Sequence, residues 1–264
     1  MISSYYDGSD VLTSDHGSSD YIRISPSSIA NFFSATRQWY GETLMNEPGF
    51  QGSDSTVLGN IVHYFAEQAG KGIKLQNAAQ LVSDYLDTQS VVTDRADIEA
   101  NWKDMSMALI EGCILNKAKP TLTEHFSYHK LLPGIYVAGT CDALVPVGNG
   151  TYSVRDYKTT STKPSGIPYH YRLQAQVYAY LLTQQGYKIS QIELQYVTRP
   201  TKTLPCRHFT FIEPFTDEDL QKVEGQLKLI AHSVQTWQQQ PELRYLLAQD
   251  YRLKLPDKPV LFKD

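Results

Sequence analysis

A β-hairpin signal in the middle of the chain constrains its fold more than any other feature. Two strand-like segments, residues 138–147 and 151–158, flank the turn Gly148-Asn149-Gly150. A short connection rich in Gly and Asn between two such segments is typical of a hairpin. If the three turn residues form the loop, Val147 pairs with Thr151. This register then determines which side chains of the two strands face each other.

The predicted register places Asp142 opposite Asp156. Side chains alternate between the two faces of a strand, so Lys158 shares a face with Asp156 and lies beside Asp142. Two opposed carboxylates lie roughly 5 Å apart and repel each other, so a fold gains nothing from them alone. A divalent cation bound between the two carboxylates would offset this repulsion. An isolated Asp-x-Lys triplet is usually ordinary surface, but two acids in register with a lysine indicate a metal-dependent site that cleaves phosphodiesters.

The composition is that of an ordinary soluble globular protein. The chain has 264 residues, of which 41% are hydrophobic and 20% are charged, enough for one large domain or two small ones with a buried core. A net charge of -4 argues against a protein that coats nucleic acid electrostatically, although it allows an enzyme with a local basic groove.

Three widely separated cysteines argue against a disulfide framework and against a four-thiolate metal site. The first residues lack the features of a secretory signal, and no apolar run approaches the ~20 residues of a membrane helix. We therefore expect a soluble cytoplasmic protein with no membrane partner.

The sequence predicts an N-terminal tail followed by one α/β domain. Residues 1–20 are rich in Ser, Asp and Gly, and we expect them to be disordered. Residues 21–264 are expected to form a single domain, with a mixed central sheet flanked by helices. Helices are predicted at about 25–44, 56–69, 75–86, 96–118, 169–185 and from Thr216, and strands at about 121–131, 135–147, 151–158, 191–198 and 206–212.

A helical histidine is the next candidate. His63 shares a helix face with Gly59 and Glu67, at a spacing of four residues. Glu67 could hold the imidazole in one tautomer while the other ring nitrogen binds a metal. A histidine on a helix is more often structural, so the sequence pattern alone leaves both readings open.

Gln174 and Tyr178 lie four residues apart on the helix expected after the hairpin. Gln174 could hydrogen-bond Lys158 or a phosphate, and Tyr178 could contact a nucleic-acid backbone. An amphipathic helix that tolerates a few polar groups explains the same pattern.

Together these residues resemble the RecB-like branch of the PD-(D/E)xK nuclease superfamily, which includes phage and CRISPR-associated exonucleases. That branch has four motifs in a fixed order, and the similarity covers roughly residues 22–198. Four ordered motifs are far more specific than one. The matching pairs in this chain are Gly59 with His63, Gly139 with Asp142, Asp156 with Lys158, and Gln174 with Tyr178.

The resemblance implies a restriction-endonuclease-like core and a Mg²⁺ or Mn²⁺ site. Four groups would hold the metal: His63, Asp142, Asp156 and the backbone carbonyl of Tyr157. The catalytic residues would be Asp142, Asp156, Lys158, Gln174 and Tyr178. Glu124 matches an acidic position that is often seen at the start of the first strand of this region. Some relatives hold an iron–sulfur cluster, but Ala35-Thr36 stands where a Cys-Pro would be expected, so we expect a version without the cluster.

The implied activity is exonucleolytic hydrolysis of DNA ends in recombination, repair or phage replication. The partners would be DNA and a recombinase, a single-strand-binding protein or a helicase. The alternatives are an endonuclease specific for a structure or for single strands, a non-catalytic DNA-binding subunit, and a hydrolase of small phosphodiesters. Four basic residues could guide the DNA, although each could equally be solvated surface charge: Lys163, Arg172, Arg199 and Lys202.

Overall fold

The computed structural model describes residues 21–45, 47–115, 118–201, 204–240 and 242–243. In these residues six strands form one mixed sheet in the order β1-β3-β4-β5-β6, with β2 also paired to β3. The expected α/β fold with a mixed central sheet is confirmed. The strands are β1 (Ile22–Ile24), β2 (Leu122–Leu132), β3 (Ile135–Gly148), β4 (Thr151–Thr160), β5 (Ile189–Thr198) and β6 (His208–Pro214).

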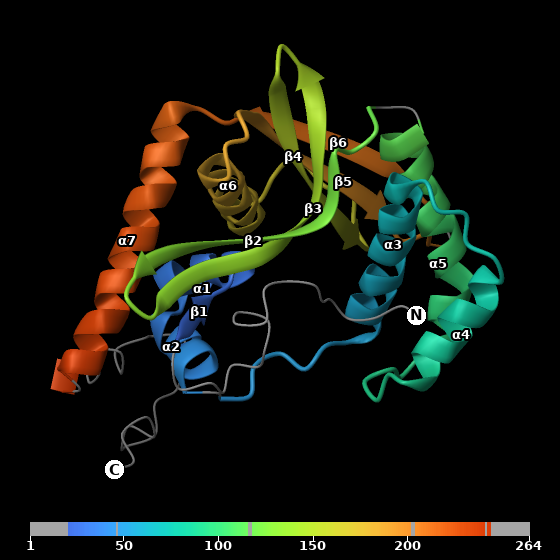
Figure 1. Cartoon of the computed structure of the whole chain (residues 1–264). Helices are drawn as coiled ribbons and strands as arrows, with labels where there is room; N and C mark the ends of the chain where they lie inside the picture. The colour runs from blue at the N-terminus through green and yellow to red at the C-terminus, as the bar shows by residue number, and fades with distance from the viewer. Residues whose placement is uncertain (1–20, 46, 116–117, 202–203, 241, 244–264) are drawn as a thin grey trace.

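Helices cover both faces of this sheet (Figure 1). One face carries α1 (Ile29–Ser34), α2 (Thr36–Leu44), α6 (Tyr169–Gln184) and α7 (Asp217–Gln239). The other face carries α3 (Asp54–Lys71), α4 (Ala78–Asp87) and α5 (Arg95–Ile110), which continues as a π-helical turn over Glu111–Leu115. Successive residues of each strand enter these two cores alternately, as the pleat requires. We call the first surface the α6 face and the second the α3 face.

The hairpin between β3 and β4 is one residue tighter than predicted. Thr151 pairs with Gly148, so Val147 is left as a bulge and does not pair with Thr151. The loop is therefore Asn149 and Gly150, whose φ values of 51° and 70° are both positive. Positive φ at both loop positions defines the type I′ turn that suits a two-residue hairpin. Beyond the bulge the pairing follows the predicted register.

One edge of β3 is left unpaired in its middle. β2 pairs with the opposite edge of β3 along most of its length. On the shared edge, β1 pairs with residues 135–137, and β4 pairs only from Ala143 to the turn. Residues 138–142 of β3 therefore have no strand beside them on this edge. Figure 1 shows β2 and β3 curving together towards α7 and away from β4. This gap in the sheet is where Asp142 lies.

Several predicted elements differ from the structure in detail. The helix expected from residue 25 to Leu44 is a 3₁₀ turn (Pro26–Ser28) followed by α1 and α2, because Ala35 leaves the helical region with φ -152° and ψ 57°. The short strand β1 was not predicted. Thr216 and Asp219 form the expected capping box of α7. The expected tail over residues 1–20 lies outside the described residues. None of the described helices combines the length and apolar character that a membrane span requires.

Candidate active site

A pocket of about 330 Å³ lies over the gap in β3. It is built where β1, β3, β4, α3 and α6 meet, so residues far apart in the sequence reach one space. Among the described residues it is lined by Arg23, Ser25, Ser27, His63, Phe126, Gly139, Thr140, Asp142, Asp156, Lys158, Gln174 and Tyr178. The structure therefore brings together both aspartates, the lysine, the histidine, the glutamine and the tyrosine that the sequence singled out.

Asp142 closes the gap between β3 and β4 with its side chain. Pairing of the two strands ends at Ala143, and the backbone N–H of Tyr157 donates instead to Oδ2 of Asp142 at 2.6 Å. Burial raises the pKa of Asp142 to about 6, against the opposing effects of Lys158 and of this hydrogen bond. The Asp142 side chain thus takes the place of a strand-to-strand hydrogen bond and is held in one position by it. Lys158 and this hydrogen bond offset only part of the cost of burying its negative charge.

Asp156 and Lys158 form a buried ion pair two residues apart on β4. Nζ of Lys158 lies 2.7 Å from Oδ2 of Asp156 and donates to Oε1 of Gln174 at 3.3 Å. Burial raises the pKa of Asp156 to about 6, and the nearby charge of Asp142 adds to the effect. Burial alone would lower the pKa of Lys158, but the two aspartates outweigh it and the pKa lies above its usual value. The lysine is therefore a charged ammonium held in place by a carboxylate and an amide.

His63 reaches the pocket from α3. Its Nδ1 lies 3.7 Å from Oδ2 of Asp142, and its ring packs edge-on against Tyr157 at 5.8 Å between centroids. Burial, with the charge of Lys158, lowers the pKa of His63 to about 4, so the imidazole is neutral at neutral pH and makes no true ion pair. Glu67 pairs with Lys71, and no contact between Glu67 and His63 is present among the described residues. The structure therefore gives no support to the proposed tautomer-fixing role of Glu67.

Glu124 adds a third acid beside Asp142. The pairs on either side of it, Thr123 with Ala143 and His125 with Cys141, place it across from Asp142 on β2. Its φ is 47°, an uncommon conformation for a residue other than glycine and one that concentrates at functional sites. Burial and the charge of Asp142 raise the pKa of Glu124 to about 9. Its Oε2 is buried without a hydrogen-bond partner among the described residues.

Two motif glycines allow close approach of backbones at the site. A Cβ on Gly139 would lie 2.7 Å from Pro26 and 3.1 Å from Tyr178, so any side chain there would push the first helical turn and α6 away from β3. A Cβ on Gly59 would lie 3.2 Å from the hydroxyl of Thr159. These contacts give a packing reason for each glycine of the two motifs.

The four candidate DNA-binding residues have different surroundings. Arg172 donates to both carboxylate oxygens of Glu213, at 2.5 and 2.7 Å. Arg199 is paired with Asp97. Lys163 lies in the loop after β4, and Lys202 lies outside the described residues. The two arginines are therefore already engaged by acids, which leaves less positive charge for a substrate than the sequence indicated.

Four further residues lie at the site without having been predicted as part of it: Arg23, Ser25, Ser27 and Tyr171. Arg23 reaches the pocket only because β1 pairs with β3, and its guanidinium lies 5.6 Å from the ring centre of Phe126. The ring of Tyr171 covers Nζ of Lys158 at 4.6 Å. Its spacing of three residues from Gln174 on α6 was a usable signal, since residues three apart share a helix face. No local sequence pattern predicted that Arg23 would line the pocket.

The donor set fits a hard divalent cation in its chemistry. Two buried carboxyl groups, Asp142 and Asp156, line the pocket with one ammonium and a neutral imidazole, and Glu124 lies next to Asp142 outside the pocket lining. Oxygen with imidazole ligands suits Mg²⁺ or Mn²⁺. Within the described part of the chain, no three His, Cys, Asp or Glu side chains already converge as a finished ligand set. The oxygens of Asp142 and Asp156 are instead held by Tyr157 and Lys158.

Comparisons with known proteins agree with this arrangement. A protein-family model described as the PD-(D/E)XK nuclease superfamily matches residues 23–254. A crystal structure from Eubacterium rectale, described as a candidate exonuclease, has a TM-score of 0.58 at 17% identity and covers 96% of this chain and 97% of its own; this likeness shows the fold alone. The alkaline exonuclease of Laribacter hongkongensis has a TM-score of 0.36 at 14% identity, over 85% and 91% of the two chains, which is too low to carry an argument. No protein with a curated description matches the chain.

Proposed function

Because this chain belongs to the PD-(D/E)XK nuclease superfamily, we propose that it is a Mg²⁺- or Mn²⁺-dependent deoxyribonuclease that degrades DNA from its ends. One observation carries the proposal: the Lys158–Asp156 pair lies in one pocket with Asp142 and with the neutral imidazole of His63. Buried acids with raised pKa values, gathered around a single lysine, are costly for a fold and are typical of a functional site.

Four groups would hold the metal: Asp142, Asp156, Nε2 or Nδ1 of His63, and the backbone carbonyl of Tyr157. Glu124 lies close enough to Asp142 to influence its charge and is a candidate fifth group. A metal bound there would lower the pKa of a coordinated water and polarise a phosphate oxygen.

The protein's own groups have separate tasks in this scheme. Lys158 is held as an ammonium by Asp156, so it is suited to neutralise negative charge on the phosphate and less suited to remove a proton from water. Gln174 accepts from Lys158 and thereby fixes its direction. Tyr178 hydrogen-bonds Gln174, and Tyr171 covers the ammonium and limits its access to water.

Attack on DNA ends is supported by the resemblance to RecB-like exonucleases and by the description of the structurally similar Eubacterium rectale protein. We propose roles in recombination, repair or phage replication in the cytoplasm, with a recombinase, a single-strand-binding protein or a helicase as protein partner. Residues 21–264 would act as one nuclease domain.

The test uses end-labelled linear DNA and circular single-stranded DNA with Mn²⁺. The wild type should shorten the linear DNA and leave the circle intact. Asp156→Ala and Lys158→Ala should each lower the rate by at least ~10²-fold. Asp84→Asn, an exposed change on α4, is the matched control and should keep the wild-type rate. Cleavage of the circle would identify an endonuclease, and DNA binding without any cleavage would identify a non-catalytic subunit.

Metal binding gives a second readout that does not depend on activity. Mn²⁺ at about 100 times its Kd should stabilise the wild type by about 2.7 kcal/mol. The thermal shift should disappear in Asp156→Ala and persist in Asp84→Asn. An equal shift in both variants would place the metal elsewhere.

A further inference from the structure

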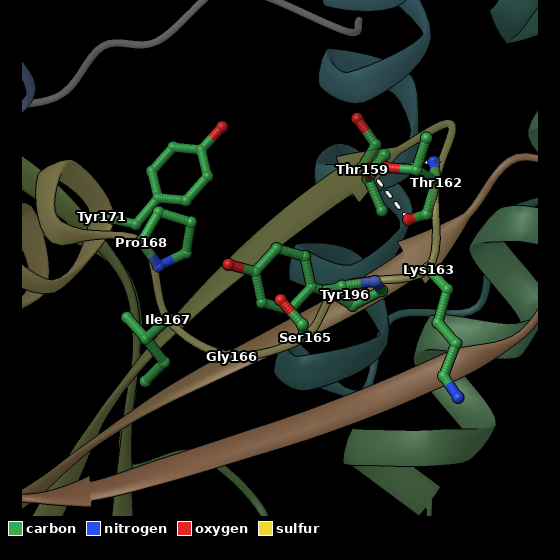
Figure 2. A pocket seen from close by; sticks show the side chains of 11 residues that line it. Thr159, Thr162, Lys163, Ser165, Gly166, Ile167, Pro168, Tyr171 and Tyr196 are labelled. Atoms are coloured by element: carbon green, nitrogen blue, oxygen red, sulfur yellow. Dashed lines mark hydrogen bonds between the residues drawn. The ribbon is translucent and has the colours of Figure 1, made fainter.

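A second pocket of about 400 Å³ lies next to the proposed active site. Its lining comes from the end of β4, from the loop that leads to α6, from Tyr171 and from Tyr196 (Figure 2). Tyr171 connects the two spaces, since its ring lines the second pocket and also lies 4.6 Å from Nζ of Lys158, which lines the first. The volume is within the roughly 300–1,000 Å³ of small-molecule sites. The two pockets are thus neighbours that share a wall.

The hydroxyl of Tyr196 is the strongest indication of a ligand. Tyr196 is only 3% exposed, and its Oη has no hydrogen-bond partner among the described residues. Figure 2 shows the ring in the middle of the pocket, with the hydroxyl directed towards the side of Pro168. Buried polar groups are almost always paired, so an unpaired tyrosine hydroxyl at a pocket needs an explanation. A bound polar group would supply the missing partner.

Strand register places Tyr196 next to the catalytic lysine. In the parallel pairing of β4 with β5, Tyr196 is the direct neighbour of Lys158. Both side chains therefore lie on the α6 face of the sheet. A ligand that reaches Tyr196 is only one strand away from the ammonium that would contact the phosphate.

The other lining groups suit a phosphate with an attached sugar or base. Hydroxyls of Thr and Ser residues contribute, and no carboxylate is among the described lining residues. The loop leads directly into α6, whose first-turn N–H groups and positive dipole end favour an anion. Tyr171 and Pro168 provide flat apolar surfaces. Lys163 lies at the rim, and Figure 2 shows its ammonium directed away from Tyr196, a position from which it can attract a strand without filling the pocket.

We propose that the second pocket binds a nucleotide unit of the DNA strand, adjacent to the unit whose phosphate lies at Lys158. The phosphate of this unit would meet the Thr and Ser hydroxyls and the start of α6, and its sugar or base would lie against Tyr171. The hydroxyl of Tyr196 would donate to it. The site rests on the proposed nuclease function, since such a unit reaches it only as part of a strand.

Binding of dTMP to the metal-free protein tests this directly, by isothermal titration in EDTA. Tyr196→Phe removes only the unpaired hydroxyl and should weaken dTMP binding about three- to tenfold without lowering the melting temperature. Gly166→Leu adds a side chain where a Cβ meets no atom within 4 Å, and it should weaken binding more than tenfold. The matched controls, Tyr187→Phe and Gly225→Leu, should bind as the wild type does. The controls lie outside the pocket lining, and Gly225 likewise has open space for a Cβ.

Kinetics on linear DNA test the role of the second pocket separately from the proposed nuclease activity. Tyr196→Phe should raise KM several-fold and leave kcat within about twofold, because it touches positioning and not the metal groups. If dTMP binds Tyr196→Phe and Gly166→Leu as tightly as the wild type, the pocket assignment is overturned even when DNA is cleaved. If inorganic phosphate binds as tightly as dTMP, the site is a simple anion site and the assignment also fails. If the wild type binds dTMP as expected but cleaves no DNA, the nuclease proposal fails instead.

Discussion

Arg155 and Asp156 are consecutive residues of β4 with opposite surroundings. Both are almost fully buried, at 1% and 2% exposure, but they point to different faces of the sheet. On the α3 face, Arg155 meets fixed partners, with Nε 3.1 Å from Oε1 of Glu193 and a 2.7 Å hydrogen bond to the carbonyl of Cys113. On the α6 face, Asp156 meets one lysine and the like charge of Asp142. The fold alone accounts for a buried charge that is fully paired. A buried excess of carboxylates over cationic groups is instead typical of a site that binds a cation.

On the α3 face, the polar contacts around Arg155 and Glu193 include more than this one ion pair. Gln195 donates to Glu193 and accepts from Thr210 at 2.7 Å, and its Oε1 lies 2.5 Å from Nε2 of His208. The hydroxyl of Ser153 also reaches Glu193 at 3.4 Å. We refer to these residues with Arg155 as the Arg155 network. It joins β4, β5 and β6 to the π-helical end of α5, so its loss should affect stability and not chemistry.

The largest effect is expected from breaking this network. Glu193→Ala leaves the guanidinium of Arg155 buried without its carboxylate and should lower the free energy of unfolding by about 3–5 kcal/mol. Chemical denaturation measures this loss. The double variant Arg155→Met with Glu193→Leu should lose less than Glu193→Ala, because it leaves no unpaired charge. Lower activity per folded molecule in Glu193→Ala would contradict a purely structural role.

The next effect concerns the rate of DNA cleavage. Asp156→Asn keeps the size of the side chain but removes its charge, so it should slow Mn²⁺-dependent cleavage at least ~10²-fold, or about 2.7 kcal/mol of activation free energy. Stopped time courses with end-labelled DNA give the rate. Stability in EDTA should fall much less than in Glu193→Ala, because Asp142 remains as an acid close to Lys158. If Asp156→Asn lost as much unfolding free energy as Glu193→Ala, the two faces would not differ in the way proposed.

A stability gain that depends on pH is expected at Asp142. Its pKa in the folded protein is raised to about 6, so ionisation destabilises the fold: the cost is absent below about pH 4, grows as the pH rises to 6, and is complete above it. Asp142→Asn avoids that cost and can still accept from Tyr157. In EDTA at pH 8 it should therefore be more stable than the wild type by on the order of 2–3 kcal/mol, with no gain at pH 4. Denaturant titrations at both pH values test the sign, and an equal difference at the two pH values would contradict it.

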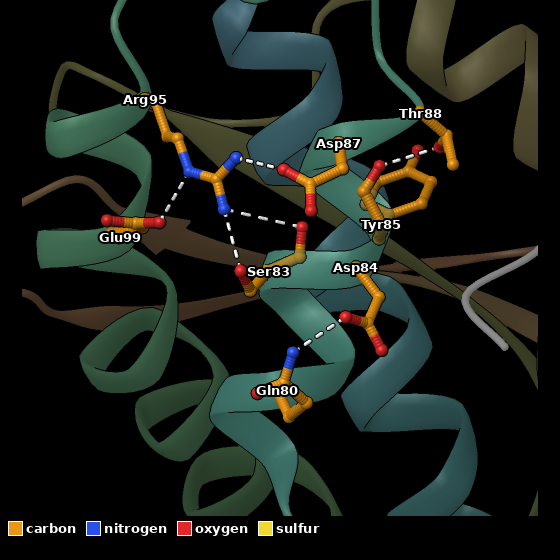
Figure 3. Close-up of polar contacts among 8 residues, drawn as sticks. All are labelled: Gln80, Ser83, Asp84, Tyr85, Asp87, Thr88, Arg95 and Glu99. Carbon is orange, nitrogen blue, oxygen red and sulfur yellow. Dashed lines mark hydrogen bonds and ion pairs between the residues drawn. The ribbon is translucent and has the colours of Figure 1, made fainter.

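The smallest effect is expected from an arginine whose acidic partners are exposed. Arg95 donates to Glu99 at 2.7 Å and to the hydroxyl of Ser83 at 2.7 Å, and it pairs with Asp87, which ties α4 to α5 (Figure 3). Water competes for all these groups, so Arg95→Gln should leave the melting temperature almost unchanged. A loss close to that of Glu193→Ala would show that burial does not separate the two arginine networks.

The sequence predicted the hairpin and its acids because the signals were local. The turn residues determined the register, and the register placed Asp142 and Asp156 on one face. The bulge at Val147 was missed because a Gly-Asn-Gly turn fits a two- or a three-residue loop. On α6, helical spacing placed Gln174 and Tyr178 on one face, but only the resemblance distinguished them from the polar groups of an ordinary amphipathic helix. His63 needed the resemblance as well, since its place depends on how α3 packs on the sheet.

What the sequence did not predict depends on strands that are distant along the chain. The Arg155 network and the second pocket both require β5 to lie parallel to β4, and no local pattern in residues 151–198 specifies that neighbour. The gap in β3 requires β1, which is only three residues long and too short for a periodic signal. These features come from tertiary pairing.

Strand β1 also has a consequence for the order of events during synthesis. Ile22 pairs with Ile135, more than a hundred residues further along the chain. At roughly 5–20 residues per second, a ribosome needs on the order of 5–25 s to make that partner after β1 has been translated. The wall of the pocket that carries Arg23 therefore cannot form while the N-terminal third of the chain is being made, and the nascent protein gains a complete pocket only after its central strands have emerged.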